Sequence, residues 1–256
     1  MIAGSDNLIF LLVAFFLIAF LYASVGFGGG SSYLALLALP VFALPFPAIR
    51  AAALCCNLVV VTGGTWIYWR RGELSLRDFA PFLLSVPAAY VGGSWLIREH
   101  TFFMLLGSTL LVVSGLLWWQ PGHRTNPTPV VSDVPAYRAG LGAAIGLLSG
   151  MVGIGGGIFL SPVMHLLRWS DAKKIAATAS AFILVNSVGG LAGQLYWGIP
   201  DLRLAWIVPL LLAVLAGGQL GTRVGTTRFN PLVIRRITAL LILVASIHIL
   251  KEHWLR

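Results

Sequence analysis

Long, unbroken apolar runs limit what this chain can fold into, because each is long enough to cross a lipid bilayer. A spanning helix needs about 20 predominantly apolar residues, whereas a transmembrane β-barrel needs short strands of alternating polarity. The runs are continuous, so we predict an all-α polytopic membrane protein. The predicted spanning helices are Asn7–Val25, Ala48–Trp69, Phe79–Ile97, Phe102–Trp119, Tyr137–Val152, Ala172–Tyr196, Leu204–Thr222 and Leu232–Leu250, and the shorter apolar segments are Ser31–Phe42 and Ile158–Leu167.

Composition and charge support the same class. Hydrophobic residues make up 58% and charged residues 10% of the 256 residues, against about 25% charged in an average soluble domain. A soluble enzyme, a secreted disulfide scaffold and a disordered chain are therefore excluded. The formal net charge of +9 comes from cations at the ends of apolar runs, which is where cytoplasmic anchors lie. We predict a lipid bilayer, and no nucleic acid, as a partner.

The chain carries an internal repeat that divides it into two halves. The matched landmarks are GFGGG at 26–30 with GIGGG at 153–157, RAAA at 50–53 with KIAA at 174–177, and the glycine pairs at 63–64 and 92–93 with those at 189–190 and 217–218. Duplicated halves are the usual build of secondary transporters. We predict a first transmembrane repeat over 1–119, an inter-repeat loop over 120–136 and a second repeat over 137–256.

The glycine motifs decide how the two halves are oriented. If each motif is only a kink, the Lys and Arg residues divide 8 against 9 between the two sides of the membrane. If the chain turns back at each motif, they divide 12 against 5, which is a normal positive-inside bias. We therefore predict inverted repeats, each with a glycine-tipped helical hairpin followed by three spanning helices. The count does not distinguish a return arm that crosses fully from one that is re-entrant.

A helix that restarts after a glycine motif offers an anion free backbone N–H groups and the positive end of its dipole. Glycine also lets a ligand approach the backbone closely. The alternative is close helix packing through glycine, which is common in membranes. The predicted substrate-binding residues are Gly28, Gly29, Gly30, Ser31, Ser32, Asn57, Gly155, Gly156, Gly157, Thr178, Ser180 and Asn186.

Two cations open the helices that follow the hairpins, Arg50 in the first half and Lys174 in the second. Under the inverted topology they lie on opposite faces of the membrane. One interpretation is that each attracts the anion at one mouth of the pathway. The other is that both side chains snorkel to the interface.

No chemistry-bearing cluster is evident in the apolar segments. All eight Asp and Glu residues lie at or near predicted loops or ends, so a proton relay through membrane carboxylates is disfavoured. We find no metal-ligand cluster, nucleophile motif or nucleotide fingerprint. We therefore predict no cofactor, no metal and no enzymatic activity. Sodium held by backbone carbonyls, or a proton carried with the substrate, stays open as a coupling ion.

The glycine motifs in their wider context resemble the TauE/SafE family of membrane permeases. The resemblance rests on Ala23–Gly30 and Leu148–Gly157, followed by Pro162 and then Lys174–Ser180, and it covers nearly the whole chain. It implies transport of small sulfur-containing anions such as sulfite, sulfonates or sulfoacetate, often outward from the bacterial cytoplasm. The first half departs from the pattern at 55–57, where Cys-Cys-Asn stands in place of small hydroxylated residues.

Together these features predict a secondary transporter, an exporter of small sulfur-containing anions in the bacterial inner membrane. Alternating access would occur around a midplane site formed by the two glycine motifs. The alternatives are a passive anion channel that uses the same helix ends, and a membrane subunit that does not itself transport.

Overall fold

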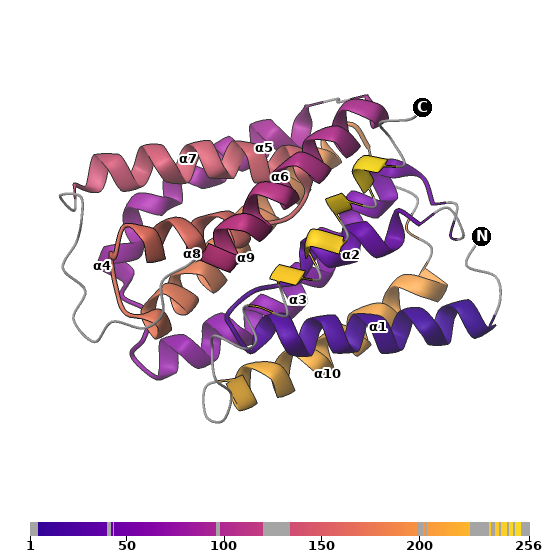
Figure 1. Cartoon of the computed structure of the whole chain (residues 1–256), viewed down its shortest axis with the longest axis horizontal. Helices are drawn as coiled ribbons and strands as arrows, with labels where there is room; N and C mark the ends of the chain where they lie inside the picture. Colours follow the sequence, from indigo (N-terminus) through magenta and orange to yellow (C-terminus); the bar gives the residue numbers. More distant parts are fainter. Residues whose placement is uncertain are drawn as a thin grey trace.

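The fold is described from a computed structural model, which covers residues 5–39, 42, 44–95, 98–119, 134–198, 202, 204–225, 236, 239–240, 242–244, 246–247 and 249–251. Its helices are α1 (Ser5–Ala23), α2 (Gly30–Leu37), α3 (Phe46–Arg70), α4 (Leu76–Phe79), η2 (Ala80–Leu84), α5 (Ser85–Ser94), α6 (Glu99–Trp119), α7 (Pro135–Val152), α8 (Gly157–Leu166), α9 (Ala172–Leu195) and α10 (Leu204–Gly225). The regular structure in these residues is helical, as predicted (Figure 1).

Most predicted helices agree with the observed ones to within a few residues, and one differs in kind. The helix predicted over Phe79–Ile97 is divided into α4, the 3-10 helix η2 and α5. Pro81 lies in the first turn of η2, and a proline lacks the N–H that an α-helix interior needs. Within the last predicted helix, Leu232–Leu250, the described residues are helical and belong in part to the apolar helix Ile242–Lys251. The inter-repeat loop lies almost wholly outside the described residues.

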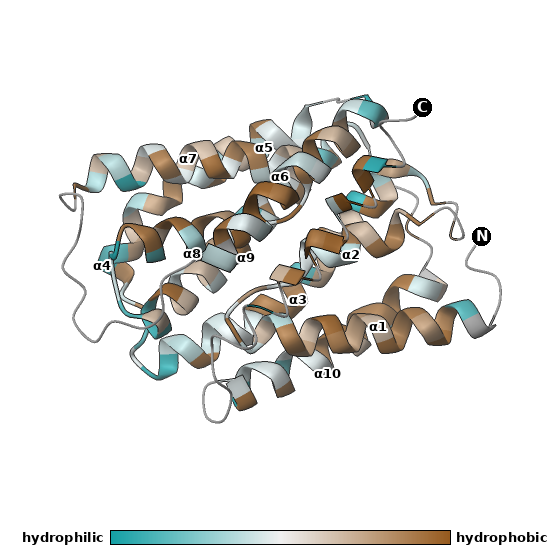
Figure 2. Ribbon diagram, viewed as in Figure 1, coloured by the Kyte–Doolittle hydropathy of each residue, from teal (hydrophilic) through white to brown (hydrophobic). Residues whose placement is uncertain are grey.

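Three described helices are long and apolar enough to cross a membrane, namely Phe46–Arg70, Ala172–Leu195 and Ala205–Gly225. Shorter apolar helices accompany them, including Asn7–Ala23 and His100–Leu116. Figure 2 shows hydrophobic residues along most of the bundle and hydrophilic ones gathered at helix ends and connections. This distribution is expected of a bundle surrounded by lipid.

Two helix pairs form the opposite sides of the molecule, α1 with α10 and α5 with α7 (Figure 1). In both pairs the helices touch through glycines four residues apart. A Cβ built on Gly217 or Gly221 of α10 would collide with carbonyl oxygens of α1, and one on Gly146 or Gly150 of α7 with those of α5. In each pair the residue numbers of the contacting residues rise together on both helices, so the two helices are parallel.

Between these pairs lie the two longest helices, α3 and α9, packed against each other. Gly64 of α3 faces Ser180 of α9, whereas Gly190 of α9 faces Leu54 of α3. The residue numbers rise on one helix as they fall on the other, so α3 and α9 are antiparallel. A hydrogen bond of 3.0 Å joins the hydroxyls of Thr65 and Ser180 across this contact.

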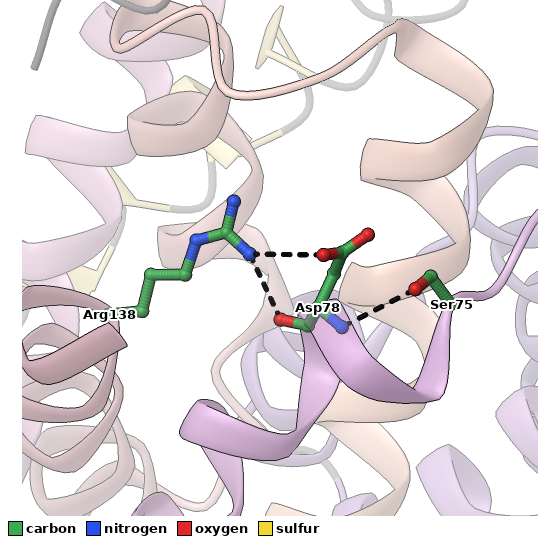
Figure 3. A network of polar contacts seen from close by, with 3 residues as sticks. All are labelled: Ser75, Asp78 and Arg138. Atoms are coloured by element: carbon green, nitrogen blue, oxygen red, sulfur yellow. Dashed lines mark hydrogen bonds and ion pairs between the residues drawn. The ribbon is translucent and has the colours of Figure 1, made fainter. Parts of the chain in front are cut away.

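A buried arginine fixes the start of α7 to α4 (Figure 3). Nη1 of Arg138 donates to the carbonyl oxygen of Asp78 at 3.1 Å and lies 3.9 Å from its carboxylate. Ser75 caps the same turn by accepting from the Asp78 N–H. The guanidinium also lies over the ring of Trp169, 5.3 Å from its centroid. These contacts hold α4, α7 and the segment after α8 together.

Candidate functional site

The first interruption, which we call the first glycine break, comprises residues 24–29 between α1 and α2. Gly26 and Gly29 have φ of 85° and 86°, values that L side chains rarely adopt. Beyond the break α2 lies against α1: the ring of Tyr33 stacks on Phe15 at 4.6 Å. The Tyr22 and Ser32 hydroxyls are 2.7 Å apart. Predicted site residue Ser32 is therefore tied to the end of α1.

The second glycine break comprises residues 153–156 between α7 and α8. Gly153, Gly155 and Gly156 all have φ close to 80°. The Gly153 N–H donates to the carbonyl of Ser149 at 2.7 Å, which ends α7 in the left-handed manner typical of glycine C-caps. Gly156 is the N-cap of α8, as Gly29 is of α2. Both restarted helices therefore begin from a left-handed glycine.

Asn57 of α3 contacts both breaks and is fully buried. Its Nδ2 donates to the carbonyl of Ile154 in the second break at 2.8 Å. A Cβ built on Gly28 or Gly30 would collide with the same amide group, so the first break also lies directly against it. Among the described residues, Oδ1 of Asn57 has no hydrogen-bond partner. One predicted site residue thus brings the two breaks together.

The surroundings of the two breaks correspond at a constant shift. Gly28 faces Asn57 and Val61 of α3, and its counterpart Gly155 faces Ile183 and Ser187 of α9. Ile183 and Ser187 each come 126 residues after Asn57 and Val61 in the chain. Likewise, Gly26 faces Ala176, and Gly153 faces Arg50, which is 126 residues before Ala176. Each break therefore contacts both α3 and α9 at matching positions.

Several buried polar atoms near the breaks lack a partner within the part of the chain that the structure describes. At the first break these are Ser31 Oγ, Tyr33 OH and Asn57 Oδ1. On α9 they are Asn186 Oδ1 and Ser187 Oγ. An unpaired buried polar group costs about 1–3 kcal/mol. A ligand or water that supplied the missing hydrogen bonds would remove that cost.

Sequence reasoning missed some hydroxyl groups that line the breaks. Tyr22 and Tyr33 flank the first break, and Ser149 lies beside Gly156 of the second. The Ser187 hydroxyl lies beside Gly155 and has no hydrogen-bond partner among the described residues. For Tyr22, Tyr33 and Ser149 the sequence offered a signal, because each lies within about one helical turn of a glycine motif.

Three predicted residues lie elsewhere on α9. Ser180 bonds Thr65 and also donates to the carbonyl of Val61 at 3.4 Å, so it belongs to the crossing of α3 and α9. Thr178 is buried close by on the same helix. Asn186 donates to the Phe182 carbonyl within α9 at 2.8 Å. Gly157, in contrast, opens α8 against Ile183 and Ala179.

The two cations expected at pathway mouths, Arg50 and Lys174, differ in burial and in their partners. Arg50 is buried, donates from Nη2 to the carbonyl of Gly150 at 2.9 Å and lies over the rings of Phe46 and Phe102, at 5.4 and 5.8 Å. No carboxylate of the described residues pairs with it. Lys174 is half-exposed and lies 3.7 Å from Asp171 at the start of α9. Of these two cations, Arg50 is the enclosed one, and it lies beside the second break.

These features define the class of the protein: a multi-pass helical membrane protein with two buried glycine breaks that meet at Asn57. No group of His, Cys, Asp and Glu suited to a metal is found among the described residues.

Comparison with known proteins places the chain further. Residues 11–249 match the protein family described as "Sulfite exporter TauE/SafE". The "Probable membrane transporter protein y4hK" of Sinorhizobium fredii (strain NBRC 101917 / NGR234) is 36% identical over 94% of this chain and 97% of its own. The "Probable membrane transporter protein YdhB" of Bacillus subtilis (strain 168) is 23% identical over 83% of this chain and 88% of its own. No solved structure matches.

The chain belongs to the Sulfite exporter TauE/SafE family and is a membrane transporter. The resemblance carried by its glycine motifs is confirmed.

Proposed function

We propose that this protein is a secondary transporter that exports small sulfur-containing anions, such as sulfite, sulfonates or sulfoacetate, and binds them between the two glycine breaks. The observation that carries the proposal is Asn57, one buried side chain that contacts both breaks and keeps an unpaired oxygen. Polar side chains inside a membrane are costly, and they commonly mark substrate and ion pathways. The family name, with its exported sulfite, supports the substrate class.

The proposed architecture is a pair of inverted repeats over 1–119 and 137–256. Support comes from α3 and α9, which occupy matching places in the two halves and are antiparallel. Two helices that are related by a twofold axis perpendicular to both are antiparallel. The parallel pairs, α1 with α10 and α7 with α5, also exchange places under the same operation. Alternating access would rock one group of helices against the other around the breaks.

Each break would be the tip of a helical hairpin whose return arm enters the membrane without crossing it. α2 has 8 residues and α8 has 10. At 1.5 Å per residue these arms span about 12–15 Å, roughly half of a 30 Å hydrocarbon core. Their N-termini would thus lie near the midplane, where backbone N–H groups are available only if protein or a wet cavity surrounds them.

Charge and hydroxyl groups at the breaks would complete recognition of the anion. Arg50 supplies a buried positive charge beside Gly153 of the second break. Ser31 supplies an unpaired hydroxyl in the first turn of α2. Sulfonate and sulfite oxygens accept hydrogen bonds and carry negative charge, so these donors suit them. The bacterial relatives support a location in the bacterial inner membrane.

The test is counterflow of labelled sulfite and sulfoacetate in proteoliposomes that contain the purified chain. A carrier exchanges internal unlabelled for external labelled anion, whereas a channel gives dissipating flux and a non-transporting subunit gives none. Asn57→Asp would place a carboxylate between the breaks and should abolish counterflow by charge repulsion. Asn7→Asp makes the same chemical change on α1 away from the breaks and should leave it intact. Equal flux in both variants contradicts the proposed site.

A further inference from the structure

An apolar groove opens on the outer surface of the bundle between α3, α9 and α10. It encloses about 680 Å³, and its lining includes Thr62, Trp66, Trp69, Leu184, Leu215 and Gln219. No residue of either glycine break lines it. Its volume falls within the range of about 300–1,000 Å³ that is usual for ligand-binding sites.

The groove is poorly suited to an ion, because its hydroxyls are already engaged. Thr62 Oγ1 donates to the carbonyl of Leu58 at 2.5 Å. The hydroxyl of Thr65 pairs with that of Ser180 at 3.0 Å. The remaining lining is chiefly tryptophan and leucine. A hydrocarbon chain matches this surface better than the transported anion does.

One end of the groove carries cations at the level where a lipid headgroup would lie. Arg70 ends α3, and its guanidinium lies 4.8 Å from the ring centroid of Trp66. The rings of Trp66 and Trp69 are 5.2 Å apart, and Arg71 next to them is exposed. Tryptophans together with arginines at the end of a spanning helix mark the membrane interface. Exposed basic residues there attract anionic lipids.

We infer that the groove binds one acyl chain of an anionic phospholipid, with its phosphate held by Arg70 and Arg71. The apolar lining and the cationic end are complementary to the two parts of such a lipid. This site is separate from the glycine breaks, so it stands whether or not the proposed substrate is correct.

The experiment is native mass spectrometry of the delipidated full chain after incubation with phosphatidylglycerol or with phosphatidylcholine of the same acyl chains. One phosphatidylglycerol per chain should be retained in preference to phosphatidylcholine. The double variant Arg70→Gln/Arg71→Gln should bind it about 30-fold more weakly, since two cations at the membrane surface are lost. Thr62→Phe should reduce binding by filling the groove, and Leu184→Phe does so if Thr62→Phe does not fold.

The matched control is Arg98→Gln/Lys251→Gln, which removes two exposed cations that are not next in sequence to any groove-lining residue, whereas the pair Arg70 and Arg71 directly follows Trp69. This control should retain phosphatidylglycerol. Equal retention of both lipids overturns the inference. So does unchanged binding in the Arg70/Arg71 and groove-filling variants, or an equal loss in the control. A lipid-free dimer that Thr62→Phe disrupts also overturns it, since the groove would then hold a second copy of the chain.

Discussion

The two glycine breaks share a backbone but differ in their side chains. Both restart a helix from a left-handed glycine, and both contact α3 and α9 at matching positions. At the first break, α2 begins with Ser31 and Ser32, whereas α8 begins with Ile158 and Phe159. The comparison shows that a repeated backbone conformation can be kept while only one copy carries hydroxyl groups directly after the glycine that opens the restarted helix.

The helices that contact the breaks, α3 and α9, also differ in the polarity of their side chains. In the structure Asn57 on α3 occupies the place that Ile183 occupies on α9, and Arg50 occupies that of Ala176, not that of Lys174 with which the sequence pattern pairs it. Both polar side chains on α3 reach the second half, where they bond the carbonyls of Ile154 and of Gly150. In our interpretation α3 supplies recognition to both breaks, and α9 supplies close packing. The following predictions test this division.

The largest effect is expected where the shared backbone itself is changed. Gly156→Leu requires a side chain at φ 83°, and its Cβ would lie 2.8 Å from the ring of Phe182. Flux should fall to background in protein that still elutes as a folded species. Gly72→Leu is the control, because Gly72 has φ 70° but nothing within 4 Å. Wild-type counterflow in folded Gly156→Leu would show that the break is packing only.

Exchanging the α3 and α9 side chains tests the asymmetry directly. Asn57→Ile leaves the buried Ile154 carbonyl unpaired, a loss of about 1–3 kcal/mol. The counterflow kcat/KM should fall about 10- to 100-fold if the transition state loses the same energy. Ile183→Asn buries an amide against Gly155 and should lower stability. In the protein that folds, it should change kcat/KM by less than about threefold, because α9 is assigned to packing. Similar losses in both variants would make the breaks equivalent.

Arg50 and Lys174 provide the next comparison. Arg50→Gln removes the enclosed charge and its bond to Gly150, and hydrogen bonds to charged groups are worth about 1.5–3 kcal/mol. We expect KM for the anion to rise at least about tenfold, with partial recovery in Arg50→Lys. Lys174→Gln should change KM less than about twofold, because its pair with Asp171 is half-exposed. A stronger effect at Lys174 than at Arg50 would reverse this assignment.

The smallest effect concerns a single hydroxyl. Ser31→Ala removes an unpaired buried group in the first turn of α2. If the substrate accepts from it, KM should rise about two- to tenfold, the equivalent of about 0.5–1.5 kcal/mol. Ser161→Ala, a buried hydroxyl on α8, is the control and should change KM little. An unchanged KM in Ser31→Ala would remove this hydroxyl from the site.

The sequence predicted the helices well because their boundaries follow hydropathy and glycine, which act locally. The helix interruptions at both glycine motifs were among those predictions, and the substrate-binding role of Asn57 stays a prediction. The position of Ser180 was not predicted, because its neighbour Thr65 lies 115 residues earlier in the chain. The burial of Arg50 was also missed. Its partners, the Gly150 carbonyl and the Phe102 ring, come from helices whose packing no local pattern encodes.

The parallel pairing of α1 with α10 has a consequence for synthesis of the chain. Phe16 and Phe20 of α1 present the carbonyls that Gly217 and Gly221 of α10 will cover. At about 5–20 residues per second, the ribosome reaches those glycines roughly 10–40 seconds after it has made α1. During that interval α1 lies in the membrane without the contacts that α10 makes with it. The apolar surface of α1 is compatible with lipid during this time. Its final packing is reached only after α10 has been inserted.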